Sequence, residues 1–128
     1  MITDFKIFES INEGRPDVGD WIVCDLGDEI DYMKKYKQIE KFFSENKGFI
    51  LKANFQNFDN EYKVRYYPSS EKDRKIYDSF RKQNGYENNI HGGMANVDVI
   101  DIVGPEIKYW SKNKEDLEII IQSNKYNI

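Results

Sequence analysis

The residues most able to do chemistry are few, and none of them falls into a recognised motif. His91 is the single histidine and stands in the sequence IHGGM, without the surrounding cluster of Cys, Asp and Glu that a metal site needs. Its place in an expected loop leaves a functional role open, with a turn-stabilising role as the default. Asp98 and Asp101 lie three residues apart in an expected strand, so we expect their carboxylates on opposite faces rather than as a catalytic pair.

A second acidic group surrounds the expected turn between the first strand and the first helix. It consists of Asp25, Asp28, Glu29 and Asp31. Favourable interaction with the helix N-terminus explains these side chains more simply than a hard-cation site. Cys24 lies within the expected strand, where we expect an inert, buried thiol. Because the chain contains no nucleophile elbow, phosphate loop or dinucleotide-binding motif, the sequence predicts a protein that is not an enzyme and holds no metal or cofactor.

Aromatic side chains are the other prominent feature. They make up 15% of the chain, with nine tyrosines. Tyr and Trp provide large, rigid contact area at low entropic cost, which is why protein interfaces favour them. The candidate partner-binding set comprises residues near expected strand ends and in the 86–94 loop: Tyr66, Tyr67, Tyr86, His91, Tyr109 and Trp110. An alternative is that the rings stack bases while neighbouring cations contact phosphates, with Lys63, Arg65, Lys108 and Lys112 as the nucleic-acid-binding residues.

Length and charge restrict the class of protein. A chain of 128 residues is long enough for one domain with a modest core. With 19 basic and 23 acidic residues the net charge is −4, which argues against both a strongly basic nucleic-acid binder and a heavily acidic DNA mimic. No apolar run approaches the roughly 20 residues of a membrane helix, and we expect no signal peptide. The single cysteine fits a reducing compartment, so we expect a cytoplasmic protein.

The hydrophobic periodicity predicts five strands and three helices. Near-alternation of apolar residues, bounded by turn residues, predicts strands at 21–25, 48–55, 62–67, 97–103 and 106–110. A four-three-four spacing of Tyr32, Tyr36, Ile39 and Phe43 predicts a helix over 29–46. Ser70 followed by Asp73 approximates a capping box and opens a polar helix to about Asn84. Ser111 caps a final helix over 112–123 that packs through Leu117, Ile120 and Ile121.

These elements predict an α+β fold. We expect a five-stranded antiparallel, partly open small barrel with helical insertions and a C-terminal helix. Gly104-Pro105 is expected to join the strands at 97–103 and 106–110 into a hairpin, with 18–25 as its partner. The whole chain, 1–128, is expected to form one small-barrel domain, with an N-terminal arm at 1–17 and a helix-and-loop insertion at 68–96.

Two resemblances follow from particular stretches. VGDWIVC at 18–24, followed by a hairpin rich in Lys and aromatic residues, resembles the Src-homology-3-like small barrels of the KOW kind. FKIFES near the start, VGDWIVC, and the ending EIKYWSKNKEDLEIIIQSNKYNI resemble small uncharacterised proteins of tailed phages of Bacteroidota. Abundant Lys, Asn and Ile, scarce Arg and only two alanines are typical of such an AT-rich genome. The resemblance covers both ends and the expected strands, and the 68–96 segment has no counterpart.

The phage resemblance implies a role in infection rather than a reaction. It favours an anti-defence protein, similar to anti-CRISPR proteins, that inhibits a host nuclease effector by protein–protein binding. The partner would be a host defence protein such as an RNA-guided nuclease, alone or with its guide RNA, in the cytoplasm of the infected bacterial host. The alternative is a nucleic-acid-binding module of the KOW kind, and a minor virion component is a third hypothesis.

Overall fold

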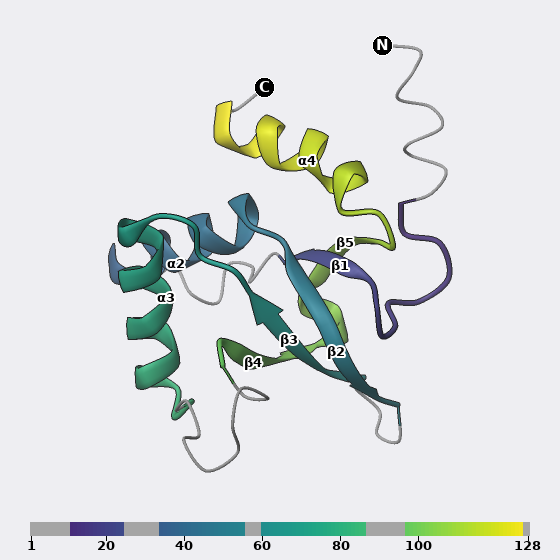
Figure 1. Cartoon of the computed structure of the whole chain (residues 1–128), viewed down its shortest axis with the longest axis horizontal. Helices are drawn as coiled ribbons and strands as arrows, with labels where there is room; N and C mark the ends of the chain where they lie inside the picture. Colours follow the sequence, from purple (N-terminus) through teal and green to yellow (C-terminus); the bar gives the residue numbers. More distant parts are fainter. Residues whose placement is uncertain (1–10, 25–33, 56–59, 87–96, 127–128) are drawn as a thin grey trace.

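The computed structural model describes residues 11–24, 34–55, 60–86 and 97–126 and has an α+β fold (Figure 1). Within these ranges five antiparallel strands form one sheet, accompanied by three α-helices that include a C-terminal one. The predicted fold class is therefore confirmed. The strands are β1 (Trp21–Cys24), β2 (Gly48–Asn54), β3 (Glu61–Tyr66), β4 (Val99–Val103) and β5 (Ile107–Ser111). The helices are α2 (Lys34–Glu45), α3 (Glu71–Gln83) and α4 (Lys114–Tyr126), with a 3₁₀ turn, η3 (Gly104–Glu106), between β4 and β5.

The strands are ordered β4-β3-β2-β1-β5 across the sheet. The predicted hairpin of β2 and β3 is present, with Ile50 opposite Val64 and a register shift in β2 just beyond that pair. β5 pairs with β1, so the predicted partnership between these two parts of the chain is also present.

The predicted hairpin of β4 and β5 is wrong, because these strands form opposite edges of the sheet. Gly104 donates its N–H to the Asn60 carbonyl at 2.8 Å, and Glu106 accepts from the Val103 N–H at 3.0 Å, so η3 holds the chain against β3 and β4 instead of turning it back. In a flat sheet, four strand spacings would separate the edges by about 19 Å. Even a fully extended chain from Val103 to Ile107 spans only about 14 Å. The sheet therefore curls strongly, although its two edges remain unpaired with each other among the described strands.

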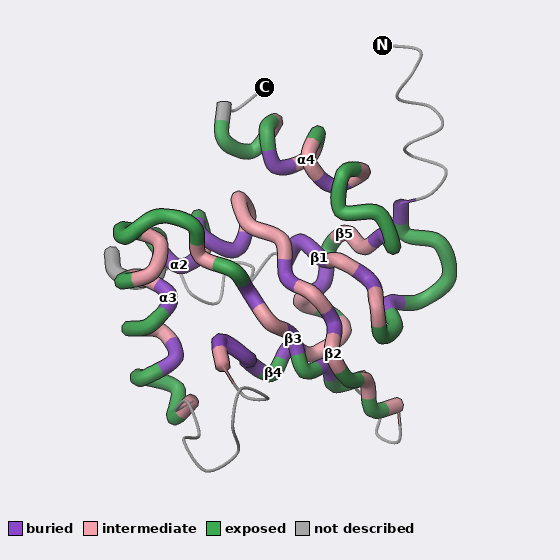
Figure 2. Tube along the Cα trace, in the orientation of Figure 1, coloured by how far each residue is buried: buried purple, intermediate pink, exposed green. Residues whose placement is uncertain are grey.

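Helices α2 and α3 cover one face of the sheet (Figure 1). Burial alternates along β3 (Figure 2), and its buried residues Tyr62, Val64 and Tyr66 belong to this core. Four rings fill its centre, Phe42 and Phe43 from α2, Tyr66 from β3 and Tyr77 from α3, with centroids 5.0–6.4 Å apart. Aromatic pairs in this range stabilise a core beyond the area that they bury.

The buried tyrosines keep hydrogen-bond partners for their hydroxyl groups. Tyr77 donates to the Asp98 carbonyl at 2.6 Å, Tyr62 donates to the Pro16 carbonyl at 2.9 Å, and Tyr66 contacts the Cys24 sulfur at 3.4 Å. Burial raises the pKa of Tyr66 well above its ordinary value, and burial also raises the pKa of Tyr77. Cys24 is buried, as expected. Much of the aromatic content is thus explained by the core.

Helix α4 covers part of the opposite face. Its buried Leu117 and Ile121 pack against Val23 of β1 and against Ile11. Asn12 lies beside β5, because its N–H donates to the Trp110 carbonyl at 2.9 Å and its side chain accepts from the Trp110 N–H at 3.0 Å. Of the expected N-terminal arm, Asn12 and Glu13 therefore contact β5, Pro16 contacts Tyr62 of β3, and 1–10 lies outside the described residues. No helix in the described ranges is long and apolar enough to cross a membrane.

Helix α3 begins at the predicted cap. The Ser70 hydroxyl accepts from the Asp73 N–H at 3.0 Å. Although its apolar content is thin, α3 contributes the fully buried Tyr77 and clamps Asp98 through Arg74, whose two terminal nitrogens donate to its carboxylate at 2.6 and 3.0 Å. Asp98 was predicted in a strand but lies just before β4 with a φ of 57°. It is buried whereas Asp101 is exposed, so the two carboxylates form no catalytic pair.

Candidate functional site: an aromatic groove beside α4

Most residues predicted to bind a partner are used by the fold itself. Tyr66 has no exposed surface and belongs to the core, so its place in the predicted surface is wrong. Tyr86 is half-buried, and its hydroxyl accepts from the Asp101 N–H at 3.1 Å at the outer edge of β4. Tyr109 is half-buried against the α4 core, and the half-buried Trp110 donates from Nε1 to the Glu13 carbonyl at 3.2 Å. His91 lies outside the described residues.

Among the described members of the predicted set, Tyr67 is the exposed one, with 52% of its surface accessible to solvent. It follows β3 and lies beside two rings that the sequence interpretation did not select. The ring of Trp21 is 4.9 Å from that of Phe49 and 5.9 Å from that of Tyr67. We call Trp21, Phe49 and Tyr67 the aromatic trio.

Strand register explains why the trio forms. Trp21 of β1 and Phe49 of β2 are directly opposite each other in the antiparallel ladder. Their neighbours Ile22 and Ile50 are fully buried under α2 and α3, so the two-residue period turns Trp21 and Phe49 to the other face. This period was present in the sequence. The period alone did not identify the trio, since it does not show that Trp21 of one strand lies opposite Phe49 of another.

A groove of about 480 Å³ is lined by Trp21 and Tyr67 of the trio and by residues of α4. We call it the aromatic groove. Trp21 and Tyr67 form its aromatic side, and Ile121 adds apolar surface from α4. Its charged lining is mixed in sign, with Glu45, Lys47, Lys114, Glu118 and Lys125.

Two contacts fix the charged side of the aromatic groove. Lys47 forms an ion pair with Glu118 at 3.3 Å, which ties the chain entering β2 to α4. The ammonium group of Lys114 lies 5.7 Å from the centre of the Trp21 ring, within the range of a cation–π interaction. The groove therefore presents an apolar wall next to both donors and acceptors.

The four predicted nucleic-acid-binding residues do not form one patch. Lys63 and Arg65 belong to β3, whereas Lys108 belongs to β5 and Lys112 follows it, so β2 and β1 separate the two pairs. Lys63 forms an ion pair with Asp101, and Lys112 forms one with Asp20 at 3.2 Å. Arg65 donates from Nε to the Val97 carbonyl at 3.0 Å. Three of these cations thus already have partners: carboxylates for Lys63 and Lys112, and a backbone carbonyl for Arg65.

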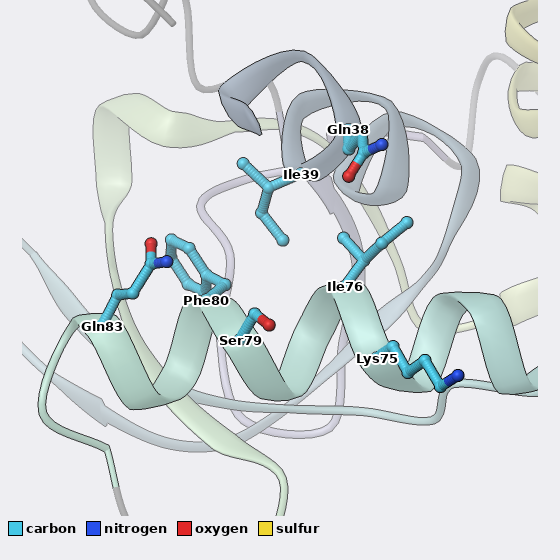
Figure 3. A pocket seen from close by; sticks show the side chains of 7 residues that line it. All are labelled: Gln38, Ile39, Lys75, Ile76, Ser79, Phe80 and Gln83. Carbon is cyan, nitrogen blue, oxygen red and sulfur yellow. The ribbon is translucent and has the colours of Figure 1, made fainter. Parts of the chain in front are cut away.

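A second hollow lies between α2 and α3, with a volume of about 250 Å³ (Figure 3). Ile39, Ile76 and Phe80 point towards one another across it, and Gln38, Lys75, Ser79 and Gln83 complete its lining. Ile76 and Phe80 also pack against the main core. We interpret this hollow as the junction of two packed helices.

Among the described residues, no group of three or more His, Cys, Asp or Glu side chains is placed to hold a metal ion. Comparison with protein-family models, with curated proteins and with solved structures finds no match for this chain.

Proposed function

We propose that this protein is a phage-encoded anti-defence protein, similar to anti-CRISPR proteins, that inhibits a host nuclease effector by binding it through the aromatic groove. The observation that carries the proposal is the aromatic trio, in which the exposed Tyr67 lies against the half-buried Trp21 and which adjoins a groove of mixed charge. The proposed place of action is the cytoplasm of the infected bacterial host.

The chemistry of the groove suits a protein partner. Trp and Tyr dominate the energetics of protein interfaces when they lie at the centre of a patch with a polar rim. Trp21 and Tyr67 meet this description, since Lys114 and the Lys47–Glu118 pair border them. A surface that carries both signs complements another protein better than it complements a uniform polyanion.

The size of the molecule is compatible with inhibition by obstruction. A standard interface buries about 800 Å² on each partner. That area is about one-tenth of the 8963 Å² of accessible surface of the described chain. The trio would form the centre of such an interface, and its surroundings on α4 and at the end of α2 would form the rim. Blocking an effector in this way needs no catalytic group.

The curled sheet supports the small-barrel resemblance, because η3 carries the chain from one sheet edge to the other within three residues. The KOW-type alternative predicts instead that the protein binds nucleic acid, with phosphates at Lys63, Arg65, Lys108 and Lys112. The two hypotheses differ in whether binding depends on nucleic acid, so one experiment can distinguish them.

The test combines capture and inhibition. Tagged protein is incubated with lysate of a Bacteroidota host, with and without nuclease treatment, and a captured defence nuclease is then purified and assayed for cleavage. We expect nuclease-resistant capture and inhibition of cleavage. Trp21→Ala and Tyr67→Ala should each weaken inhibition by about 10- to 30-fold, the effect of removing a central interface residue.

Ile119→Ala is the matched control, because Ile119 is an exposed apolar residue of α4 that does not line the groove. It should leave inhibition unchanged. Capture that disappears on nuclease treatment would favour the KOW-type alternative. Undiminished cleavage at saturating concentrations of the protein would contradict the inhibitor hypothesis.

A further inference from the structure

A third groove lies on the other side of the contact between α2 and α4. Its volume is about 520 Å³, and it opens between these helices and the strands β1 and β5. The strand residues that line it include Val23, Cys24 and Tyr109. The helices contact each other next to it, where the Asn124 side chain donates to the Ser44 carbonyl at 2.7 Å. We call this the lysine groove, because its lining includes Lys37, Lys41, Lys108 and Lys125.

The charge of the lysine groove is opposite to that of the chain. Four lysines and two glutamates, Glu40 and Glu45, line it, which gives a local charge of +2 against −4 for the whole protein. The four ammonium groups come from three separate elements, α2, β5 and α4. Folding therefore brings together cations that are far apart in the sequence. Like charges held close together destabilise the protein unless an anion neutralises them.

Ion pairing distinguishes three of these lysines from Lys47, Lys63 and Lys112 elsewhere on the surface. Lys47, Lys63 and Lys112 each lie within 4 Å of a carboxylate. Within the described part of the chain, no such pair involves Lys37, Lys41 or Lys125. Their charges are accordingly available to a ligand.

We propose that the lysine groove binds a single strand of nucleic acid, with its phosphates at Lys37, Lys41 and Lys125 and a base against Tyr109. Single strands are bound where cations follow the backbone and an aromatic ring supplies a stacking surface. Tyr109 supplies that ring, and the ammonium group of Lys108 lies 5.6 Å from the ring centre. We expect a single strand rather than a double helix, because the bases of a double helix are paired and stacked on one another, whereas a single strand offers an unpaired base to Tyr109.

This inference goes beyond the proposed function, because it concerns a different surface and a different class of ligand. An acidic protein segment would also meet the lysines, but it offers no planar base for Tyr109. The presence of the ring beside the cations therefore favours nucleic acid.

The test is a fluorescence anisotropy titration of the full chain with a labelled single-stranded oligonucleotide of about 10 nucleotides. Three phosphate contacts predict a slope of about −2 for log affinity against log salt. The double variant Lys37→Glu/Lys41→Glu should weaken binding at least tenfold. Lys72→Glu/Lys82→Glu makes the same charge change on exposed positions of α3 and should change affinity by less than a factor of two.

Tyr109 provides a second readout. Tyr109→Leu keeps an apolar side chain against α4 and should weaken binding by about fivefold or more through loss of stacking, whereas Tyr109→Phe should bind as the unchanged protein does. Equal binding by Tyr109→Leu and Tyr109→Phe would overturn the stacking role.

Three other outcomes would overturn the proposal as a whole: no binding, equal weakening by the α3 control, or equal competition by poly-glutamate or inorganic pyrophosphate. Trp21→Ala should leave oligonucleotide affinity unchanged, which separates this result from failure of the proposed inhibitor surface.

Discussion

Among the glycines that the structure describes, Gly48 is the one at which an added Cβ atom would clash with its neighbours. It opens β2, where it lies opposite Ile22 on one side and Tyr66 on the other. A Cβ atom at this position would lie 2.5 Å from Cγ1 of Val64 and 2.7 Å from Cζ of Tyr66. Carbon atoms in a packed core normally lie about 3.5–4.0 Å apart. Gly48→Ala therefore inserts a methyl group where two neighbouring side chains already stand.

The neighbours have little freedom to move. Val64 and Tyr66 are fully buried, and the ring of Tyr66 packs against Phe42, Phe43 and Tyr77. Replacing a strand glycine by alanine would otherwise stabilise a protein by about 0.5–1 kcal/mol, since it lowers the entropy of the unfolded chain. Overpacking a core costs about 1–3 kcal/mol. Because the added methyl group would clash with two rigid side chains, we expect the free energy of unfolding to fall by about 2 kcal/mol. The melting temperature should fall by about 8 °C.

Urea denaturation followed by circular dichroism measures this loss. Lys52→Ala is the control, because Lys52 is exposed in the same strand and should change stability by less than about 0.5 kcal/mol. In Gly48→Ala/Val64→Ala the closest clashing atom is gone, so the double variant should be more stable than the sum of the single effects by at least about 1 kcal/mol. Strict additivity, or a Gly48→Ala protein as stable as the original, would refute the steric argument.

Three further predictions concern the elements around this core. Ser70→Ala should lower stability in urea by about 1 kcal/mol, whereas Ser70→Asp, which also caps a helix, should have little effect. Asp98→Asn keeps a residue that tolerates the positive φ but removes the charge facing Arg74; we expect a loss of about 1 kcal/mol that shrinks at high salt. The raised pKa values of Tyr66 and Tyr77 make both side chains retain their protons above the pH of about 10 at which unfolded tyrosines ionise. Their contribution to stability is therefore complete below that pH and is lost as the pH rises above it. Tyrosinate absorbance should show both groups ionising together with unfolding, and early ionisation in the folded protein would contradict this.

Helices and strands were predicted correctly where the evidence came from residues close together in the sequence. The Ser70 cap, the alternation from Tyr62 to Tyr66, and the α4 stripe of Leu117 and Ile121 all depend on residues close in sequence. Caps and two- or three-to-four-residue periods report such short-range geometry directly.

Long-range pairing was not accessible in the same way. A hairpin through Gly104-Pro105 satisfies local turn chemistry, but β4 and β5 pair with β3 and β1 instead. The deciding contact joins Gly104 to Asn60, which lies more than forty residues away and has no local signature. The same limit explains the site: Tyr66 and Tyr67 are adjacent, and only the register of the sheet shows that the first fills the core while the second joins Trp21.

The two proposed surfaces depend on one junction. Glu45 and Lys125 line both the aromatic groove and the lysine groove, and the helices α2 and α4 meet between them through Ser44 and Asn124. On the aromatic side Lys47 is neutralised by Glu118, whereas on the other side Lys37 and Lys41 project from α2 into a groove of net positive charge. Apart from Glu45 and Lys125, which line both grooves, a protein contact and a nucleic-acid contact would therefore use different charged residues. This arrangement suits a partner that is itself a nucleoprotein, whose protein and exposed strand would meet the two grooves together.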